Sequence, residues 1–125
     1  MIDDSKTSVG PHESKLIFAC SGAADVGEIS DRAARQLTKS GAGRIFCLAG
    51  IGGRIEPIVS ATKSASKILA IDGCDMDCVI SCLRQAGFSN FRHVRVTDLG
   101  MEKGKSPATD RRIAHVAEKA KDLLD

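Results

Sequence analysis

The sequence predicts an α/β fold in three layers: a four-stranded, mostly parallel sheet with helices on both faces. Four short β-rich runs occur along the 125-residue chain, and a segment with helical periodicity follows each of them. Strict alternation of this kind is typical of a parallel sheet whose right-handed crossovers cover both faces. We expect the strand order 2-1-3-4, with the topological switch point between the first and third strands.

The four expected strands cover residues 16–20, 44–48, 67–71 and 93–97. The first three are almost continuously apolar, which is typical of strands buried on both faces. Residues 1–14 carry no hydrophobic period and are expected to form a flexible N-terminal tail. Residues 15–125 are then expected to form a single α/β domain, because a chain of this length supports one core.

Each expected helix has a recognisable start. Asp25 and Glu28 form a capping box for the first helix, and Gly41 is placed to end it. The start signals of the other three helices are, in order, Pro57, Asp75 and Ser106-Pro107. The buried seams expected for the first, third and fourth helices are Val26, Ile29, Ala33 and Leu37; Met76, Val79, Ile80 and Leu83; and Ile113, Val116, Ala117, Ala120 and Leu124.

Composition argues against several partners. The net charge is only +2, basic residues are interleaved with acidic ones, and Trp and Tyr are absent, so a nucleic-acid surface is not indicated. No apolar run approaches the ~20 residues that span a bilayer. The start Met1-Ile2-Asp3-Asp4 lacks the basic and then apolar pattern of a secretory signal, so we expect a cytoplasmic protein without a membrane partner. Five cysteines, an odd number, then favour metal or thiol chemistry over a disulfide framework.

Four of these cysteines are expected at one edge of the sheet. Cys20 ends the first strand, Cys47 lies late in the second, and Cys74 follows the third. Cys78 lies in the first turn of the next helix, four residues after Cys74, and returns to the same edge. Because the carboxyl ends of parallel strands meet there, the four thiols should converge and could hold one zinc ion, which prefers four thiolates in a tetrahedron.

Neighbouring residues could offset the charge of such a site. Three glycines of the loop 49–54, Gly50, Gly52 and Gly53, could turn backbone N–H groups toward sulfur, and Arg54 adds a cation. With Asp75 as the cap, Cys78 falls in the first helical turn, where the helix dipole lowers a thiol pKa. The same glycine loop could instead cradle an anion or be a plain turn.

Other interpretations remain open at this stage. A single buried cysteine often acts as a small apolar residue, and Cys82 is an additional thiol to which we assign no role. A thiol-dependent redox or sulfur-transfer enzyme using Cys74 and Cys78 is possible, as is an iron–sulfur electron carrier, and no catalytic residue is assigned. A thiol phosphatase is disfavoured, because its Cys-x₅-Arg loop would need Arg where Val26 stands.

Several motifs in register resemble the DGC-domain family of zinc-binding proteins. They are Cys20-Ser21-Gly22-Ala23, Cys47-Leu48-Ala49-Gly50-Ile51-Gly52-Gly53, Asp72-Gly73-Cys74 with Cys78, and Val96-Thr97-Asp98-Leu99-Gly100. The resemblance covers roughly residues 15 to 124. It implies a small cytosolic domain whose four chelating cysteines are Cys20, Cys47, Cys74 and Cys78. Asp75 stands where the family often has Pro, which adds negative charge beside the expected metal.

Overall fold

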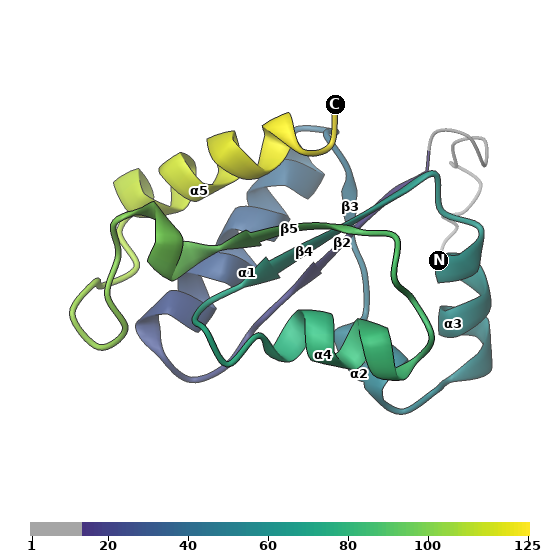
Figure 1. The fold of residues 1–125 in the computed structure, drawn as a ribbon. Coiled ribbons are helices and arrows are strands. Elements are labelled where there is room, and N and C mark those ends of the chain that lie inside the picture. Colours follow the sequence, from purple (N-terminus) through teal and green to yellow (C-terminus); the bar gives the residue numbers. More distant parts are fainter. Residues whose placement is uncertain (1–13) are drawn as a thin grey trace.

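The computed structural model describes residues 14–125, and most of the expected N-terminal tail lies outside them (Figure 1). Four strands form one sheet: β2 (Lys15–Ala19), β3 (Arg44–Ile45), β4 (Lys67–Asp72) and β5 (Arg92–Arg95). Every neighbouring pair is parallel, and the spatial order is β3-β2-β4-β5. This is the predicted order 2-1-3-4, so the α/β fold class is confirmed.

Helices cover both faces of the sheet (Figure 1). One face carries α1 (Asp25–Lys39) and α5 (Asp110–Asp122), and the other carries α2 (Leu48–Gly52), α3 (Glu56–Lys63) and α4 (Cys78–Gln85). A short 3₁₀ helix, η2 (Val96–Leu99), follows β5. Within the described residues, no helix is long and apolar enough to cross a membrane.

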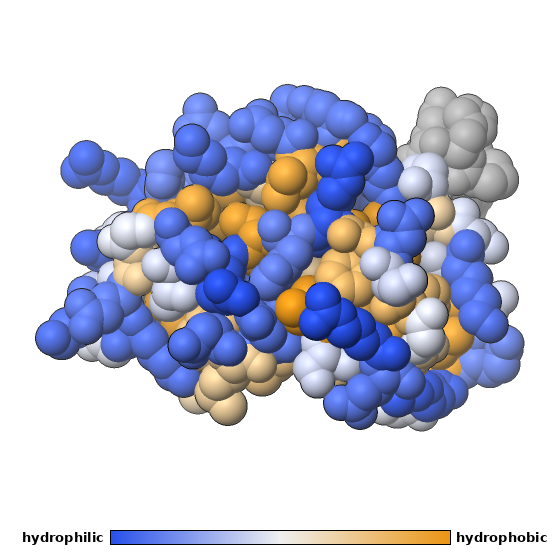
Figure 2. Space-filling model, viewed as in Figure 1, coloured by the Kyte–Doolittle hydropathy of each residue, from blue (hydrophilic) through white to orange (hydrophobic). Residues whose placement is uncertain are grey.

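Alternate residues of the two central strands build two separate apolar clusters. Ile17, Leu69 and Ile71 pack with α1 and α5, whereas Phe18 and Ala70 pack with α2 and α4. The predicted seams of α1 and α5 are buried as expected. From the side of the open β5 edge the surface is mostly hydrophilic, and hydrophobic residues show between the helical layers (Figure 2).

The second strand is shorter than predicted, and the glycine loop is a helix. β3 ends at Ile45, and Cys47 is the N-cap of α2 rather than a strand residue. The Cys47 sulfur accepts a hydrogen bond from the Gly50 N–H at 3.3 Å. Helix α2 can pack closely against α3 because residue 50 has no side chain: a Cβ there would lie 2.7 Å from Cγ1 of Ile58.

The start of the third predicted helix was also placed wrongly. Helix α4 begins at Cys78 with Asp77 as its N-cap, so Asp75 is not the cap and Met76 is not in the buried seam. Met76 is instead 68% exposed. The carboxylate of Asp72, which lies farther back in the sequence, accepts hydrogen bonds from backbone N–H groups at the start of the helix. The helix therefore begins later than the local sequence pattern predicts.

Two further helix starts differ from the expected pattern. Helix α5 begins at Asp110, because Thr109 caps it by accepting a hydrogen bond from the N–H of Arg112 at 3.3 Å. The N-cap of α1 is Ala24, and Asp25 is the first helical residue. The Asp25 carboxylate does not form the predicted capping box, because it binds backbone N–H groups of the loop before α5.

Candidate metal centre

Four cysteines lie on the connections that follow β2, β3 and β4, whose courses can be followed in Figure 1. Cys20 directly follows β2, and its N–H donates to the carbonyl of Ile71 at 2.9 Å, which extends the pairing with β4. Cys74 lies two residues beyond β4, and Cys78 is the first residue of α4. Cys47 caps α2 beyond the end of β3. Each of the four therefore lies beyond the carboxyl end of a strand, and Cys47 does so as a helix cap rather than as a strand residue.

The cysteines differ in exposure. Cys47 and Cys78 are exposed, whereas Cys20, Cys74 and Cys82 are half-buried, and all five are free thiols. Cys20 and Cys82 pack against the apolar cluster under α2 and α4, and Cys74 packs against the opposite cluster. The edge therefore offers two sulfurs to solvent and anchors the others in the core.

The sulfurs do not form a closed cage. In the part of the chain that the structure describes, no three cysteine sulfurs lie within 4.8 Å of one another. Burial raises the pKa of the Cys78 thiol, and negative charge on Cys20, Asp72, Cys74 and Cys82 raises it further. The predicted lowering of the Cys78 pKa by the helix dipole is therefore wrong, since burial and neighbouring acidic groups outweigh it.

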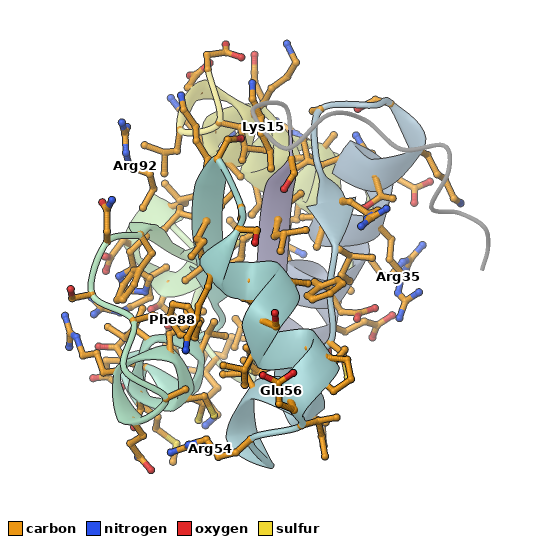
Figure 3. All side chains as sticks on the ribbon, turned by 90° about the vertical axis from the view of Figure 1, so that its right-hand side faces the viewer. Lys15, Arg35, Arg54, Glu56, Phe88 and Arg92 are labelled. Atoms are coloured by element: carbon orange, nitrogen blue, oxygen red, sulfur yellow. The ribbon has the colours of Figure 1, made fainter. Side chains whose placement is uncertain are left out.

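The segment 49–54 offers less positive charge to the cysteines than the sequence predicts, because Arg54 is bound elsewhere. Gly50 directs its N–H at the Cys47 sulfur, Gly52 lies beside Cys82, and Gly53 is the C-cap of α2. The Arg54 guanidinium binds the carbonyl end of α2, where Nη1 donates hydrogen bonds to the carbonyls of Ile51 and Gly52, both at 2.9 Å. Figure 3 shows Arg54 near Glu56, where α2 leads into α3.

A polar network missed by the sequence analysis supports the segment between Cys74 and Cys78. Asp72 is only 1% exposed, and its carboxylate accepts from the N–H groups of Val79 at 2.7 Å and Ile80 at 3.4 Å. His93 Nε2 lies 2.9 Å from Oδ2 of Asp72. The first residue of the Asp-Gly-Cys motif thus acts as an internal cap for α4.

The network continues to Asp77, whose φ of +55° is rare for a residue with a side chain. Arg95 donates two hydrogen bonds to the Asp77 carboxylate, from Nε at 2.9 Å and from Nη2 at 2.7 Å. This pairing lowers the pKa of Asp77. Asp72, Asp77 and His93 have donor atoms within 4.8 Å of one another. Because backbone N–H groups and Arg95 already bind both carboxylates, we interpret the trio as scaffolding. The i, i+2 spacing of His93 and Arg95 on one strand face was the available sequence signal.

The glycine of the same motif also has a packing role. A Cβ at Gly73 would lie 3.0 Å from the carbonyl carbon and oxygen of Val26 and 3.1 Å from the nitrogen of Gly27. Gly73 is therefore buried under the first turn of α1 and does not line the surface. The Asp-Gly-Cys motif caps α4 with its first residue, packs on α1 with its second and presents a thiol with its third.

Fold and edge together define a small α/β domain with a cysteine-lined carboxyl edge. The family model of the DGC domain matches residues 16–120, and the chain belongs to this family. It is similar to the anaerobic and virulence modulator AnvM of Pseudomonas aeruginosa, with 32% identity over 88 residues. The match covers 70% of this chain and 67% of AnvM. No solved structure matches the chain.

Proposed function

We propose that this domain is a binding module that holds one zinc ion through Cys20, Cys47, Cys74 and Cys78. The observation that carries the proposal is the position of the cysteines, since Cys20 and Cys74 follow the carboxyl ends of the paired parallel strands β2 and β4 and Cys78 begins the next helix. A bound cation would stabilise neighbouring cysteines as thiolates. Zinc is the ion that four cysteines suit best.

The exposure of the cysteines fits this role. The side chains of Cys47 and Cys78 are exposed and can change rotamer without disturbing the core. Cys20 and Cys74 are held between the strands and their covering helices and would fix the position of the ion. Changes of rotamer at Cys47 and Cys78 would close the set of four sulfurs around one metal ion.

The site lies at the surface, so its use extends beyond holding the fold together. Two apolar clusters already stabilise the domain, in contrast to the smallest zinc modules, which fold only with their metal. The description of AnvM as a modulator supports a binding or regulatory role over catalysis. The alternatives are a thiol-dependent redox or sulfur-transfer enzyme using Cys74 and Cys78, and an iron–sulfur electron carrier.

The test is metal analysis of untagged protein purified with its thiols reduced. We expect one zinc per chain, and Cys→Ser changes at each of the four positions should lower the metal content. Cys82→Ser is the matched control, because Cys82 lies on the same helix as Cys78 but packs toward α2. Equal metal loss from Cys82→Ser would contradict the ligand set. A coloured, iron-containing protein would favour the iron–sulfur carrier, and reduced thiols without metal would favour the redox enzyme.

A further inference from the structure

The loop between η2 and α5 is held in a defined shape over the cysteine edge. It turns at Gly100 and Gly104, whose φ values are +84° and +87°. The Asp25 carboxylate at the start of α1 accepts from the N–H groups of Gly104 and Ser106, both at 2.9 Å. Ser106 is buried, and its hydroxyl accepts from the N–H of Glu102 at 2.8 Å. The conformation of residues 102–106 is therefore fixed from both sides.

This loop presents one ammonium group to sulfur. Nζ of Lys103 lies 3.7 Å from Sγ of Cys74 and 3.8 Å from Sδ of Met76. Lys105, two residues further on, instead lies 3.6 Å from a carboxylate oxygen of Glu102. Two lysines of one short loop thus have different neighbours, and only the first contacts the cysteine edge in this way.

We propose that Lys103 places a positive charge beside the Cys74 sulfur, where it attracts anionic reagents to this thiol and offsets the negative charge of a metal-bound thiolate. A zinc ion with four thiolates keeps a formal charge of −2, which nearby cations and dipoles must offset. Arg54, the cation expected from the sequence, is bound to the carbonyl end of α2. Lys103 therefore takes that role. Only the metal-bound half of the proposal rests on zinc binding.

The first experiment uses the metal-free protein and compares two alkylating reagents at Cys74, with each product quantified by peptide mass spectrometry. Iodoacetate is an anion and iodoacetamide is neutral, and the same Cys74 thiolate attacks the iodomethyl carbon of either reagent and displaces iodide. The ratio of their rates therefore cancels the reactivity of the thiol and reports the local potential. At low salt, Lys103→Met should lower this ratio about two- to fivefold, in line with the modest strength of exposed charge pairs.

Lys105→Met is the matched control and should leave the ratio unchanged, whereas Lys103→Arg should keep it close to that of the wild type. Unfolding temperatures of the metal-free variants should agree, which separates a charge effect from a loss of structure. A ratio that falls equally in Lys105→Met, or that does not fall in Lys103→Met, would overturn the proposal.

The second experiment measures zinc affinity by competition with a chromophoric chelator. Lys103→Met should raise the dissociation constant about two- to fivefold over that of Lys105→Met, and Lys103→Arg should restore it. If the wild type binds no zinc while the alkylation ratio still falls in Lys103→Met, the proposed function fails and the role of Lys103 at the thiolate holds. If zinc binds and Lys103→Met changes neither quantity, the role of Lys103 is refuted and the zinc site stands.

Discussion

At the scale of single residues, the carboxylate that caps the start of α4 belongs to Asp72, which lies seven residues before Val79, the first residue whose N–H it binds. Asp72 is buried at the end of β4 and reaches Val79 and Ile80, whereas Asp75 is exposed. Capping rules describe the residue just before a helix, so they select Asp75. A buried carboxylate with several donors is the stronger interaction, because leaving those donors unpaired is costly.

Substitutions of these two aspartates distinguish the remote cap from the local one. Asp72→Asn should lower the free energy of unfolding by about 2 kcal/mol, since an amide cannot accept from all three donors. Asp75→Asn should change it by less than about 0.5 kcal/mol, as exposed substitutions usually do. Urea denaturation followed by circular dichroism measures both. A larger loss from Asp75→Asn would contradict the assignment of Asp72 as the cap.

The glycine of the Asp-Gly-Cys motif can be tested in the same way. Gly73→Ala should destabilise the domain by roughly 1–3 kcal/mol, because its Cβ would press on the backbone of Val26 and Gly27. Gly52→Ala is the control, since its Cβ would meet only the Cys82 sulfur at an ordinary 3.8 Å. This second change should be neutral or stabilising by up to about 1 kcal/mol, because alanine favours helix. Thermal unfolding of both variants gives the comparison, and equal losses would refute the packing role.

At the scale of elements, α1 organises two connections that border the cysteine edge. Its first turn packs against Gly73, and its first residue, Asp25, accepts hydrogen bonds from the loop before α5. The sequence patterns that identify helices are local, so they predicted the helix itself and its buried seam. They could not predict a carboxylate that binds backbone about 80 residues away.

The bond between Asp25 and this loop should be visible in the pH dependence of stability. The N–H groups of Gly104 and Ser106 lower the pKa of Asp25 below the 3.8 of an unperturbed aspartate. A group with a depressed pKa in the folded state stabilises it above the unfolded pKa, and this contribution is lost as pH falls through the folded value. The stability difference between wild type and Asp25→Asn should thus be constant near neutral pH and shrink below about pH 4. Urea titrations across this range measure it, and a difference that grows on acidification would contradict the assignment.

At the scale of the whole molecule, stability comes from two apolar clusters on opposite faces of one parallel sheet. The cysteine edge lies at the end of this sandwich and outside its centre. Metal binding would therefore add to a domain that already has a core, in contrast to modules whose folding depends on metal.

Chelation should accordingly leave the domain folded. With a strong zinc chelator and reduced thiols, the far-ultraviolet circular dichroism spectrum should keep its helical shape, while the unfolding temperature falls. The fall should depend on free zinc concentration, because a ligand that binds only the folded state stabilises by mass action. Loss of the helical spectrum on chelation would show that the metal, and not the two clusters, maintains the fold.

The fold could be predicted from the sequence further than the site could. Continuous apolar runs such as 67–71 and the periodic seam of α1 predict the sheet order and the layers, because both patterns arise directly from burial in the core. The early end of β3 at Ile45 and the five-residue helix α2 were not predicted, since hydrogen bonding at Cys47 and close packing at Gly50 decide them. The polar support of the site escaped prediction because Asp72, His93 and Arg95 meet only in three dimensions.

X-ray absorption at the zinc edge of the metal-loaded protein tests the central claim most directly. If Cys20, Cys47, Cys74 and Cys78 hold one ion, the spectrum should show a single shell of four sulfur atoms at ~2.3 Å from zinc. A shell that contains nitrogen or oxygen, or fewer than four sulfurs, would contradict this ligand set.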